Sequence, residues 1–385
     1  MTKLSVQAKL HPRQQSGFSL VEIMVGLVIG MLATVIMLQM LSRADENKRT
    51  TVGGNDAQMN AAIAMRNLER EIRMAGHGMS DSTLLGCTLT FKPSGESANV
   101  TIQAIAPAVI NPATSQIPSG DANTDTLLVM YSNTNAATEG TVITNATTAT
   151  KYTVTTPANF AVGDFVIASS NTRPTAPNCA LRLSQVTAVS GFDLTISNGE
   201  NALPIGSLVY NLGKSPAIRA YAIRKGTLTV CDYTQKNCGN SSYATTPDSS
   251  VWVPVASNIV SLRAQYGRDN SATTPMPKVI TQWDQLNPPL ETDSNAATAN
   301  PSIQCARARM LALRMVMVGR SNNYDKELEA DGGLPTPTWS GSTGAAINLS
   351  QSMDSTSTWK GYRYKALETT IPLRNMIWRG GDTEC

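Results

Sequence analysis

The most strongly patterned part of the chain is an apolar run near its N-terminus. Residues 18–41, FSLVEIMVGLVIGMLATVIMLQML, contain a single charged side chain, that of Glu22. As an α-helix this run would measure about 36 Å, enough to cross a bilayer core of about 30 Å. The pattern therefore predicts a membrane-spanning helix. Its carboxylate is a candidate functional group, because a charge inside a membrane is costly to keep.

A second helical pattern follows at residues 42–78. Polar residues 42–51 continue the helix, and Gly53-Gly54 predict a break or bend, after which Asn55 or Asp56 would cap a restart. Beyond it, an apolar stripe recurs at steps of three and four residues, formed by Ala61, Met65, Leu68, Ile72 and Ala75. We expect this stripe to pack against the protein's own sheet rather than against a partner.

The opposite face of this second helix is predicted to be charged. It would carry Glu69, Arg70, Glu71 and Arg73, and Gly76 and Gly78 provide stop positions. His77, between these two glycines, is expected to lie at the helix end, where the helix dipole favours a polar residue.

From residue 87 onward the pattern changes to short strands between polar turns. The predicted strands cover residues 100–105, 126–132, 152–155, 165–168, 181–189, 192–196, 208–212, 218–224, 227–233, 251–255, 259–266 and 366–373. Residues 310–318 suit a strand or a helix, and we favour a strand. Lys225-Gly226 predicts a two-residue hairpin, and Pro372 favours an edge or an end. Long loops are expected at 111–123, 269–301 and 330–357.

Composition and charge narrow the class of protein. Only 15% of residues are charged and 5% are aromatic, which suits an exported β-rich protein better than a cytosolic enzyme. The net charge of +3 includes Lys3, Lys9 and Arg13, which precede the apolar run, and without them 28 basic residues balance 28 acidic ones. This balance indicates no direct site for nucleic acid.

All six cysteines follow the apolar run, and none forms a CxxC pair, so we expect disulfides from an oxidising compartment rather than a metal site. Cys231 and Cys238 are the pair that the sequence supports most directly, because they close a short polar turn. Cys87–Cys179 and Cys305–Cys385 then follow by elimination alone, so the connectivity stays open. The alternative is that some are free buried thiols.

Residues that could carry chemistry are few. His11 and His77 are the two histidines, which argues against a multi-histidine metal site or a histidine-based nucleophile system. Asp121-x-Asn123-x-Asp125 is similar to the start of a calcium loop but lacks its glycine and final glutamate, so we favour a turn leading into the next strand. Residues 206–215 fail the spacing of a phosphate loop and fit a strand ending in a turn. We therefore expect no enzyme, no cofactor and no metal.

The N-terminus resembles a type IV prepilin. A basic leader, a Gly-Phe junction, a glutamate five residues into the apolar run and a polar chain beyond follow in that order. A secretory signal cleaved after Ser42-Arg43-Ala44 is an alternative, but the apolar run is too long for it, and it leaves Glu22 unexplained. A plain membrane anchor also leaves Glu22 unexplained.

The resemblance implies roles for Gly17, Phe18 and Glu22, and the spacing of two glycines suggests a further contact. A prepilin peptidase would cut between Gly17 and Phe18 and methylate the new N-terminus, and Glu22 would act in filament assembly by neutralising the ammonium of a neighbouring subunit. Gly26 and Gly30 have a GxxxG spacing that permits close helix packing, although glycine is also common in membrane helices generally. No proline interrupts residues 18–41, so family-style helix melting there is in doubt.

The rest of the chain resembles W-type minor pilins of the PilW family. The similar stretches are LEREIRMAG at 68–76, DTLLVMY at 125–131, IVSLRAQYG at 259–267 and TTIPLRN at 369–375. The resemblance implies an α+β fold, in which one long N-terminal helix packs its second half on a β-rich, disulfide-stapled head. It divides the chain into a leader (1–17), a membrane and filament-core helix (18–41), an amphipathic continuation (42–78) and a periplasmic or extracellular head (79–385).

Such a protein would sit in the bacterial inner membrane with its head in the periplasm and then move to the pilus and cell surface. Its implied partners are the prepilin peptidase, other minor and major pilins, the assembly platform and a PilY-type tip adhesin, in attachment, twitching motility or DNA uptake. The nearest alternative is a pseudopilin of a type II secretion system. A membrane-anchored periplasmic adhesin or binding protein is the alternative from a different class.

Overall fold

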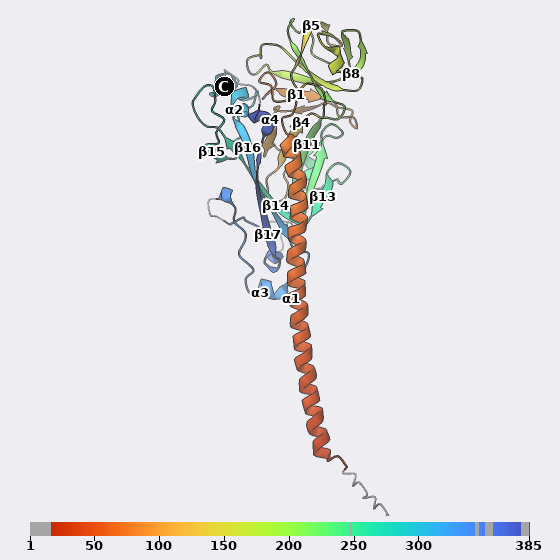
Figure 1. Cartoon of the computed structure of the whole chain (residues 1–385), viewed down its shortest axis with the longest axis vertical. Helices are drawn as coiled ribbons and strands as arrows, with labels where there is room; N and C mark the ends of the chain where they lie inside the picture. The colour runs from red at the N-terminus through yellow and green to blue at the C-terminus, as the bar shows by residue number, and fades with distance from the viewer. Residues whose placement is uncertain (1–16, 247, 343–345, 351–356, 379–384) are drawn as a thin grey trace, which may run out of the picture. The chain divides into compact units, whose positions relative to one another are not determined.

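The computed structural model describes residues 17–246, 248–342, 346–350, 357–378 and 385 (Figure 1). Most of the expected leader, residues 1–16, therefore lies outside the described residues, as do parts of the expected loop at 330–357. The chain forms two compact units, residues 1–52 and residues 53–385. The second unit is called the head below.

The boundary between the two units falls inside the first helix, α1 (Leu20–Met74). The prediction of a break at Gly53-Gly54 is wrong, because the backbone is helical through both glycines and no second helix starts at Asn55 or Asp56. Each glycine costs about 1 kcal/mol relative to alanine in a helix. Strong helical sequence on both sides, and packing of the segment that follows, outweigh that cost.

The head is built from three sheets. Its strands are β1 (Thr88–Phe91), β2 (Val100–Ile102), β3 (Ala108–Ile110), β4 (Leu127–Tyr131), β5 (Thr141–Thr148), β6 (Lys151–Val154), β7 (Phe165–Ser169), β8 (Ala180–Ser190), β9 (Asp193–Ile196), β10 (Leu208–Gly213), β11 (Ala217–Arg224), β12 (Thr227–Asp232), β13 (Val253–Ser257), β14 (Ile259–Arg268), β15 (Gln282–Asp284), β16 (Met310–Arg320) and β17 (Tyr364–Pro372). Short helices are α2 (Ile303–Ala308), α3 (Lys326–Ala330) and α4 (Arg374–Ile377).

The largest sheet has the strand order β2-β1-β8-β7-β10-β5-β6-β9, and β8 also pairs with β9. This second pairing closes six strands, β5 to β10, into a ring with a core of its own, which includes Tyr152, Val166, Leu194 and Val209. The ring is an insertion between β4 and β11, which are neighbouring antiparallel strands of the second sheet. Figure 1 shows β5 and β8 at one end of the head.

The other two sheets, β13-β12-β11-β4-β3 and β15-β14-β16-β17, share the main core with the second half of α1. The predicted apolar stripe is confirmed, because all five of its residues are buried there, Leu68 and Ile72 almost completely. Gly319 of β16 permits close contact, since a Cβ at this position would lie 2.3 Å from the carbonyl oxygen of Ala57. The α+β prediction is therefore confirmed.

Most predicted strands are confirmed within two residues, and 310–318 is a strand. The 100–105 prediction overran β2, and the 251–255 prediction began before β13. Lys225 and Gly226 both have positive φ, 49° and 66°, as the predicted hairpin turn requires. Three short strands, β1, β3 and β15, and the eight-residue strand β5 had no prediction, and β15 occupies part of the loop expected at 269–301. Pro372 ends β17, which is an edge strand among the described residues.

Candidate functional site

The first candidate site is the start of α1. Gly17, Phe18 and Ser19 precede the helix, and the carbonyl of Ser19 accepts hydrogen bonds from the N–H groups of Glu22 (2.9 Å) and Ile23 (3.2 Å). Glu22 is thus in the first turn. The positive end of the helix dipole lies there, so the helix itself stabilises a carboxylate at this position.

The following turns of α1 have the dimensions of a membrane span. The span Leu20–Glu46 contains an 18-residue window with a mean hydropathy of 2.5, and none of that window is buried. Gly26 and Gly30 lie one turn apart on the same face, and no atom outside the helix lies within 4 Å of a Cβ built on either. The face they share is therefore open to close approach by another helix.

The second half of α1 is bound to the head through Glu71 as well as through its apolar stripe. The Glu71 carboxylate accepts a hydrogen bond from the Tyr131 hydroxyl (2.6 Å) and pairs with Arg219 Nη1 (2.8 Å). The prediction that Glu71 lies on the outer charged face is wrong, because its side chain is only 14% exposed and points at β4 and β11. Burial and then the bond to Glu71 raise the pKa of Tyr131, so this hydroxyl stays a donor.

The C-terminal end of α1 is closed by residues distant in sequence. Gly76, with φ of 80°, donates its N–H to the carbonyl of Met130, and His77 Nδ1 lies 2.8 Å from Ser132 Oγ. Asn375 Nδ2 reaches the carbonyls of Met74 (3.1 Å) and Ala75 (3.0 Å). Helix ends leave unpaired carbonyls, and here a side chain 300 residues away satisfies two of them.

Three disulfides hold the head together: Cys87–Cys179, Cys231–Cys238 and Cys305–Cys385. The sequence suggested the same three pairs, the second because its cysteines close a short turn and the other two by elimination. The first links the start of β1 to the start of β8, the second closes the turn after β12, and the third joins α2 to the C-terminal residue.

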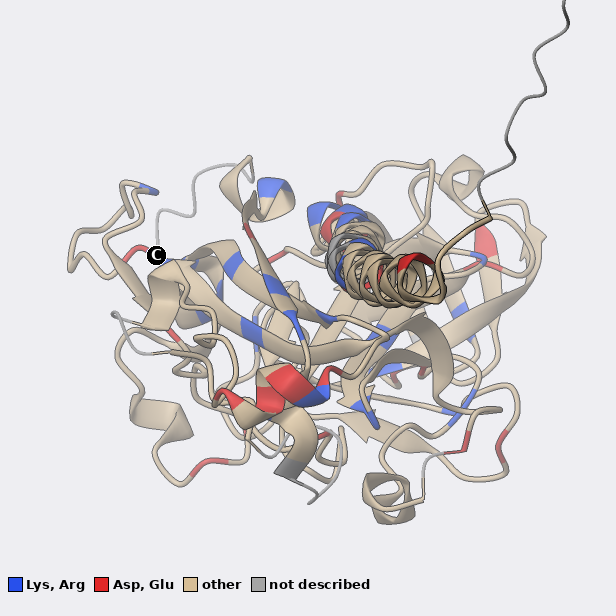
Figure 2. Cartoon of the chain, turned by 90° about the horizontal axis from the view of Figure 1, so that it is seen from below, with Lys and Arg blue, Asp and Glu red and all other residues tan. Residues whose placement is uncertain are grey.

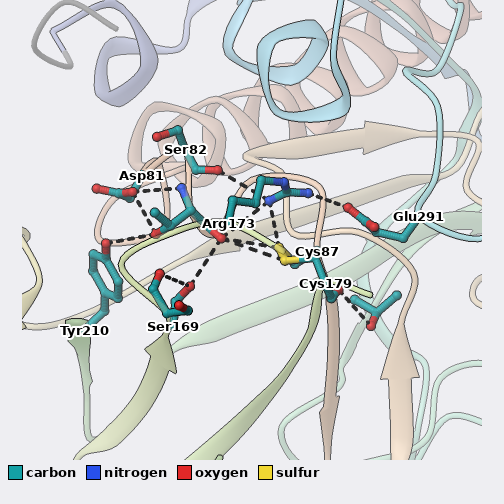
Figure 3. Close-up of a disulfide and its surroundings, with 11 residues drawn as sticks. Asp81, Ser82, Cys87, Ser169, Arg173, Cys179, Tyr210 and Glu291 are labelled. Atoms are coloured by element: carbon teal, nitrogen blue, oxygen red, sulfur yellow. Dashed lines mark hydrogen bonds and ion pairs between the residues drawn. A yellow bond between two sulfur atoms is a disulfide. The ribbon is translucent and has the colours of Figure 1, made fainter. Parts of the chain in front are cut away.

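Figure 3 shows Arg173 lying over the Cys87–Cys179 disulfide. Its guanidinium contacts Cys87 Sγ (2.8 Å) and the carbonyl of Thr83 (3.4 Å), and it forms an ion pair with Glu291. Burial lowers the pKa of Arg173, an effect that the neighbouring carboxylate opposes. Arg173 thus connects three separate segments of the chain.

Several side chains of the head are of types that can bind a metal ion, but they make bonds within the head itself. Cys87, Cys179 and Glu291 lie close together, but the sulfur atoms form a disulfide and are not free thiolates. Asp121 accepts from the N–H groups of Lys225 and Gly226 (both 2.7 Å), so it caps the β11–β12 turn instead of presenting free oxygens to a cation.

Asp125, the last residue of the calcium-like pattern, is also occupied. It accepts from the N–H of Ala264 (2.9 Å) and from Asn111 Nδ2 (2.9 Å), and it pairs with Arg263 (3.2 Å). The interpretation as a turn leading into the next strand is confirmed, since β4 starts at Leu127. Likewise, residues 206–215 contain β10 and the turn that follows it.

Sequence reasoning missed the contacts of Arg219, Asn375 and Arg173. Asn375 lies in the stretch TTIPLRN, which was noted only for its resemblance to a family. No local sequence pattern predicts the partners of these three residues, because each partner lies in a distant segment of the chain.

Comparisons with known proteins agree with this geometry. The family model "Type IV Pilus-assembly protein W" matches residues 220–375, and the model "Prokaryotic N-terminal methylation motif" matches residues 12–38. The first begins after the six-stranded ring and ends at Asn375. The second covers the start of α1, including Glu22.

Two individual proteins are also similar. The type II secretion system core protein G of Pseudomonas aeruginosa strain PAO1 is 47% identical over 61 residues, which are 16% of this chain and 43% of that protein. The chain thus spans less than half the length of this relative. A type IV-like pilin from Thermus thermophilus matches at 11% identity over 56% of this chain and 86% of that one, with a TM-score of 0.20, too low to add to the description of the fold.

Proposed function

We propose that this type IV prepilin-like chain, which carries a PilW domain and a prepilin methylation motif, is a minor pilin of a type IV pilus. The observation that carries the proposal is the order of parts along the chain. The methylation motif overlaps the start of an apolar helical span whose side chains are exposed, and a PilW domain follows. An exposed apolar helix needs a membrane or other helices around it, and a pilin uses both in turn.

In this proposal a prepilin peptidase cuts between Gly17 and Phe18 and methylates the new amino group of Phe18. The cut creates an ammonium next to an apolar helix, with Glu22 one helical turn away. Inside a filament that ammonium is desolvated, and a carboxylate from a neighbouring subunit is the natural counter-charge. Glu22 would thus set both the charge balance and the axial register between subunits.

Before assembly, the apolar half of α1 would cross the inner membrane once, with the head in the periplasm. During assembly it would leave the lipid and pack among other pilin helices, where Gly26 and Gly30 allow close approach. The proposed partners are major pilins, other minor pilins, the assembly platform and a PilY-type adhesin at the tip. Surface attachment and twitching motility are the processes in which such a tip complex would act.

A pseudopilin of a type II secretion system is the second candidate, supported by the 47% identity to core protein G. That similarity extends over 61 residues, whereas the PilW match covers 156 residues of the head and favours the pilus. Deleting the gene distinguishes the two, since loss of surface pili supports the first candidate and loss of a secreted substrate supports the second.

The central experiment compares Glu22→Gln with Glu46→Gln in pili sheared from cells. Glu46 is an exposed glutamate on the same helix, at the end of the apolar span, so it controls for loss of a charge. We expect both variants to be cut and methylated at Phe18, as read by N-terminal mass spectrometry, and only Glu22→Gln to be missing from pili.

Normal incorporation of Glu22→Gln would refute the assembly role. A wild-type protein that begins at Asp45 would instead support a secretory signal, and an unprocessed, membrane-anchored protein would support an anchored adhesin. Gly17→Ala is expected to leave an uncut chain in the inner membrane.

A further inference from the structure

The strand β17 offers an open edge on the head. It pairs with β16 along one side, and among the described residues the sheet ends there. An open edge is a template for another strand, and proteins usually block it with prolines, charges or covering segments. Pro372 ends β17, and the charged residues Lys365 and Glu368 lie along it, but among the described residues no further strand pairs with its outer side.

The hydrogen-bond pattern shows which backbone groups face outward. Leu373 donates its N–H to the carbonyl of Leu311, and Ser321 donates its N–H to the carbonyl of Arg363, which fixes these as hydrogen-bonded pairs. In an antiparallel ladder such pairs alternate with pairs that point away from each other. The N–H and C=O groups of residues 366, 368 and 370 therefore point away from β16, toward the open edge.

A groove lies beside this edge, between β17 and the second half of α1. Its volume is about 630 Å³, and it is lined by Ala62, Met65, Arg66, Glu69, Arg70, Arg73 and Leu367. Its apolar lining residues are Ala62, Met65 and Leu367. The volume lies within the range of about 300–1,000 Å³ that is typical of ligand sites.

The groove has a local excess of positive charge. Its ionisable lining consists of three arginines and one glutamate, and Glu69 already pairs with Arg73. Arg66 and Arg70 are exposed and one helical turn apart. Figure 2 shows basic and acidic positions interspersed over the head, so this one-sided lining is a local feature.

The other face of β17 is apolar near its start. Tyr364 and Ala366 pack there with Trp359 against a small core that contains Trp339. Glu368, on the same face, accepts a hydrogen bond from the N–H of Ser340 (3.1 Å). A strand added to the open edge would therefore meet arginines on one face and apolar side chains on the other.

We propose that β17 and this groove bind an extended polypeptide segment of a partner protein in which acidic and apolar residues alternate. The segment adds as a fifth strand beside β17 and bonds to the outward backbone groups of residues 366, 368 and 370. Its acidic side chains lie over Arg66 and Arg70, and its apolar side chains lie beside Ala366. This is recognition by strand addition, in which main-chain bonds supply affinity and alternate side chains supply specificity.

The test uses the full chain in detergent and a fluorescent nine-residue peptide in which glutamate and valine alternate. Fluorescence anisotropy is expected to detect binding that weakens as salt is added, and a lysine–valine peptide is expected to bind at least tenfold more weakly. The double change Arg66→Glu with Arg70→Glu should reverse this preference. Lys214→Glu, an exposed cation outside the groove, should leave it unchanged.

The strand itself is tested at residue 370. Thr370→Pro removes an outward N–H without removing a bond to β16, and it is expected to abolish binding, whereas Thr370→Val is expected to bind normally. Hydrogen exchange on the unaltered chain gives a second readout that needs no variant. Binding should slow exchange at residues 366, 368 and 370.

Unchanged exchange at these three residues, full binding by Thr370→Pro, or equal binding of the acidic and basic peptides would each overturn the proposal. None of these outcomes affects processing at Phe18 or the role of Glu22. A failure here is therefore distinguishable from a failure of the proposed function.

Discussion

Replacing Glu71 with glutamine should destabilise the head far more than the same change at Glu69, two residues away. The side chain of Glu71 is 14% exposed. Its carboxylate accepts hydrogen bonds from the Tyr131 hydroxyl (2.6 Å) and from Arg219 Nη1 (2.8 Å). Glu69 is 27% exposed, and its partner among the described residues is Arg73, four residues along the same helix. The first pair joins α1 to two strands, whereas the second joins two turns of one helix.

The magnitudes follow from burial and from the number of bonds. A hydrogen bond to a charged group contributes roughly 1.5–3 kcal/mol, and breaking a fully buried ion pair costs about 3–5 kcal/mol. The Arg219 side chain is 34% exposed and also pairs with Asp232 (3.6 Å). Water and the Asp232 carboxylate would therefore still stabilise its charge after Glu71 is replaced, which reduces the cost of the substitution. We expect Glu71→Gln to cost about 2 kcal/mol. Glu69→Gln should cost about 0.3–0.5 kcal/mol, as is typical of an exposed helix pair.

Urea unfolding of the full chain in detergent, followed by tryptophan fluorescence, measures both values. A double-mutant cycle with Arg219→Met separates the ion pair from the bond to Tyr131, for which Tyr131→Phe is the matched change. If Glu71→Gln costs no more than Glu69→Gln, the contacts of Glu71 do not hold α1 on the head, and the buried stripe alone does so.

Three further changes test other contacts of the head. Asn375→Ala removes two side-chain bonds to the last carbonyls of α1 and should cost about 1 kcal/mol in urea unfolding, with hydrogen exchange faster in the last turn of the helix; unchanged exchange would contradict the capping role. Replacing both Cys87 and Cys179 with alanine should cost about 2–5 kcal/mol, and a smaller loss would mean that Arg173 and its partners hold this junction without the disulfide. Asp121→Ala leaves two turn N–H groups unpaired and should cost about 1–3 kcal/mol, which Asp121→Asn should partly restore.

The sequence was most informative where a local pattern repeats. The apolar run with Glu22, the stripe from Ala61 to Ala75 and most strands of the head are visible as periodicity, because each depends on which side of one element is buried. The hairpin at Lys225-Gly226 was also predictable, since its backbone angles restrict the residue types that fit.

Local signals failed where the flanking sequence or a distant segment overrode them. Gly53-Gly54 reads as a break, but the helix continues because both of its flanks favour helix. Strands as short as β3 and β15 have three residues each, too few to show a period, and they form because a longer neighbour offers an edge. The six-stranded ring depends on the pairing of β8 with β9 and of β10 with β5, which no single segment encodes.

By itself, the sequence determined that the chain has an apolar helix with one carboxylate, an amphipathic continuation and a β-rich, cysteine-stapled remainder. These properties follow from the order of apolar and polar residues, whereas the proposed roles of Gly17, Phe18 and Glu22 come from the resemblance of the N-terminus to a type IV prepilin. Only the tertiary structure decided that Glu71 faces inward to Arg219, that Asn375 closes α1, and that β17 is an edge strand, among the residues described, beside an arginine-lined groove. The physical reason is that burial, ion pairing and strand edges are properties of pairs of segments, and sequence distance says nothing of which segments meet.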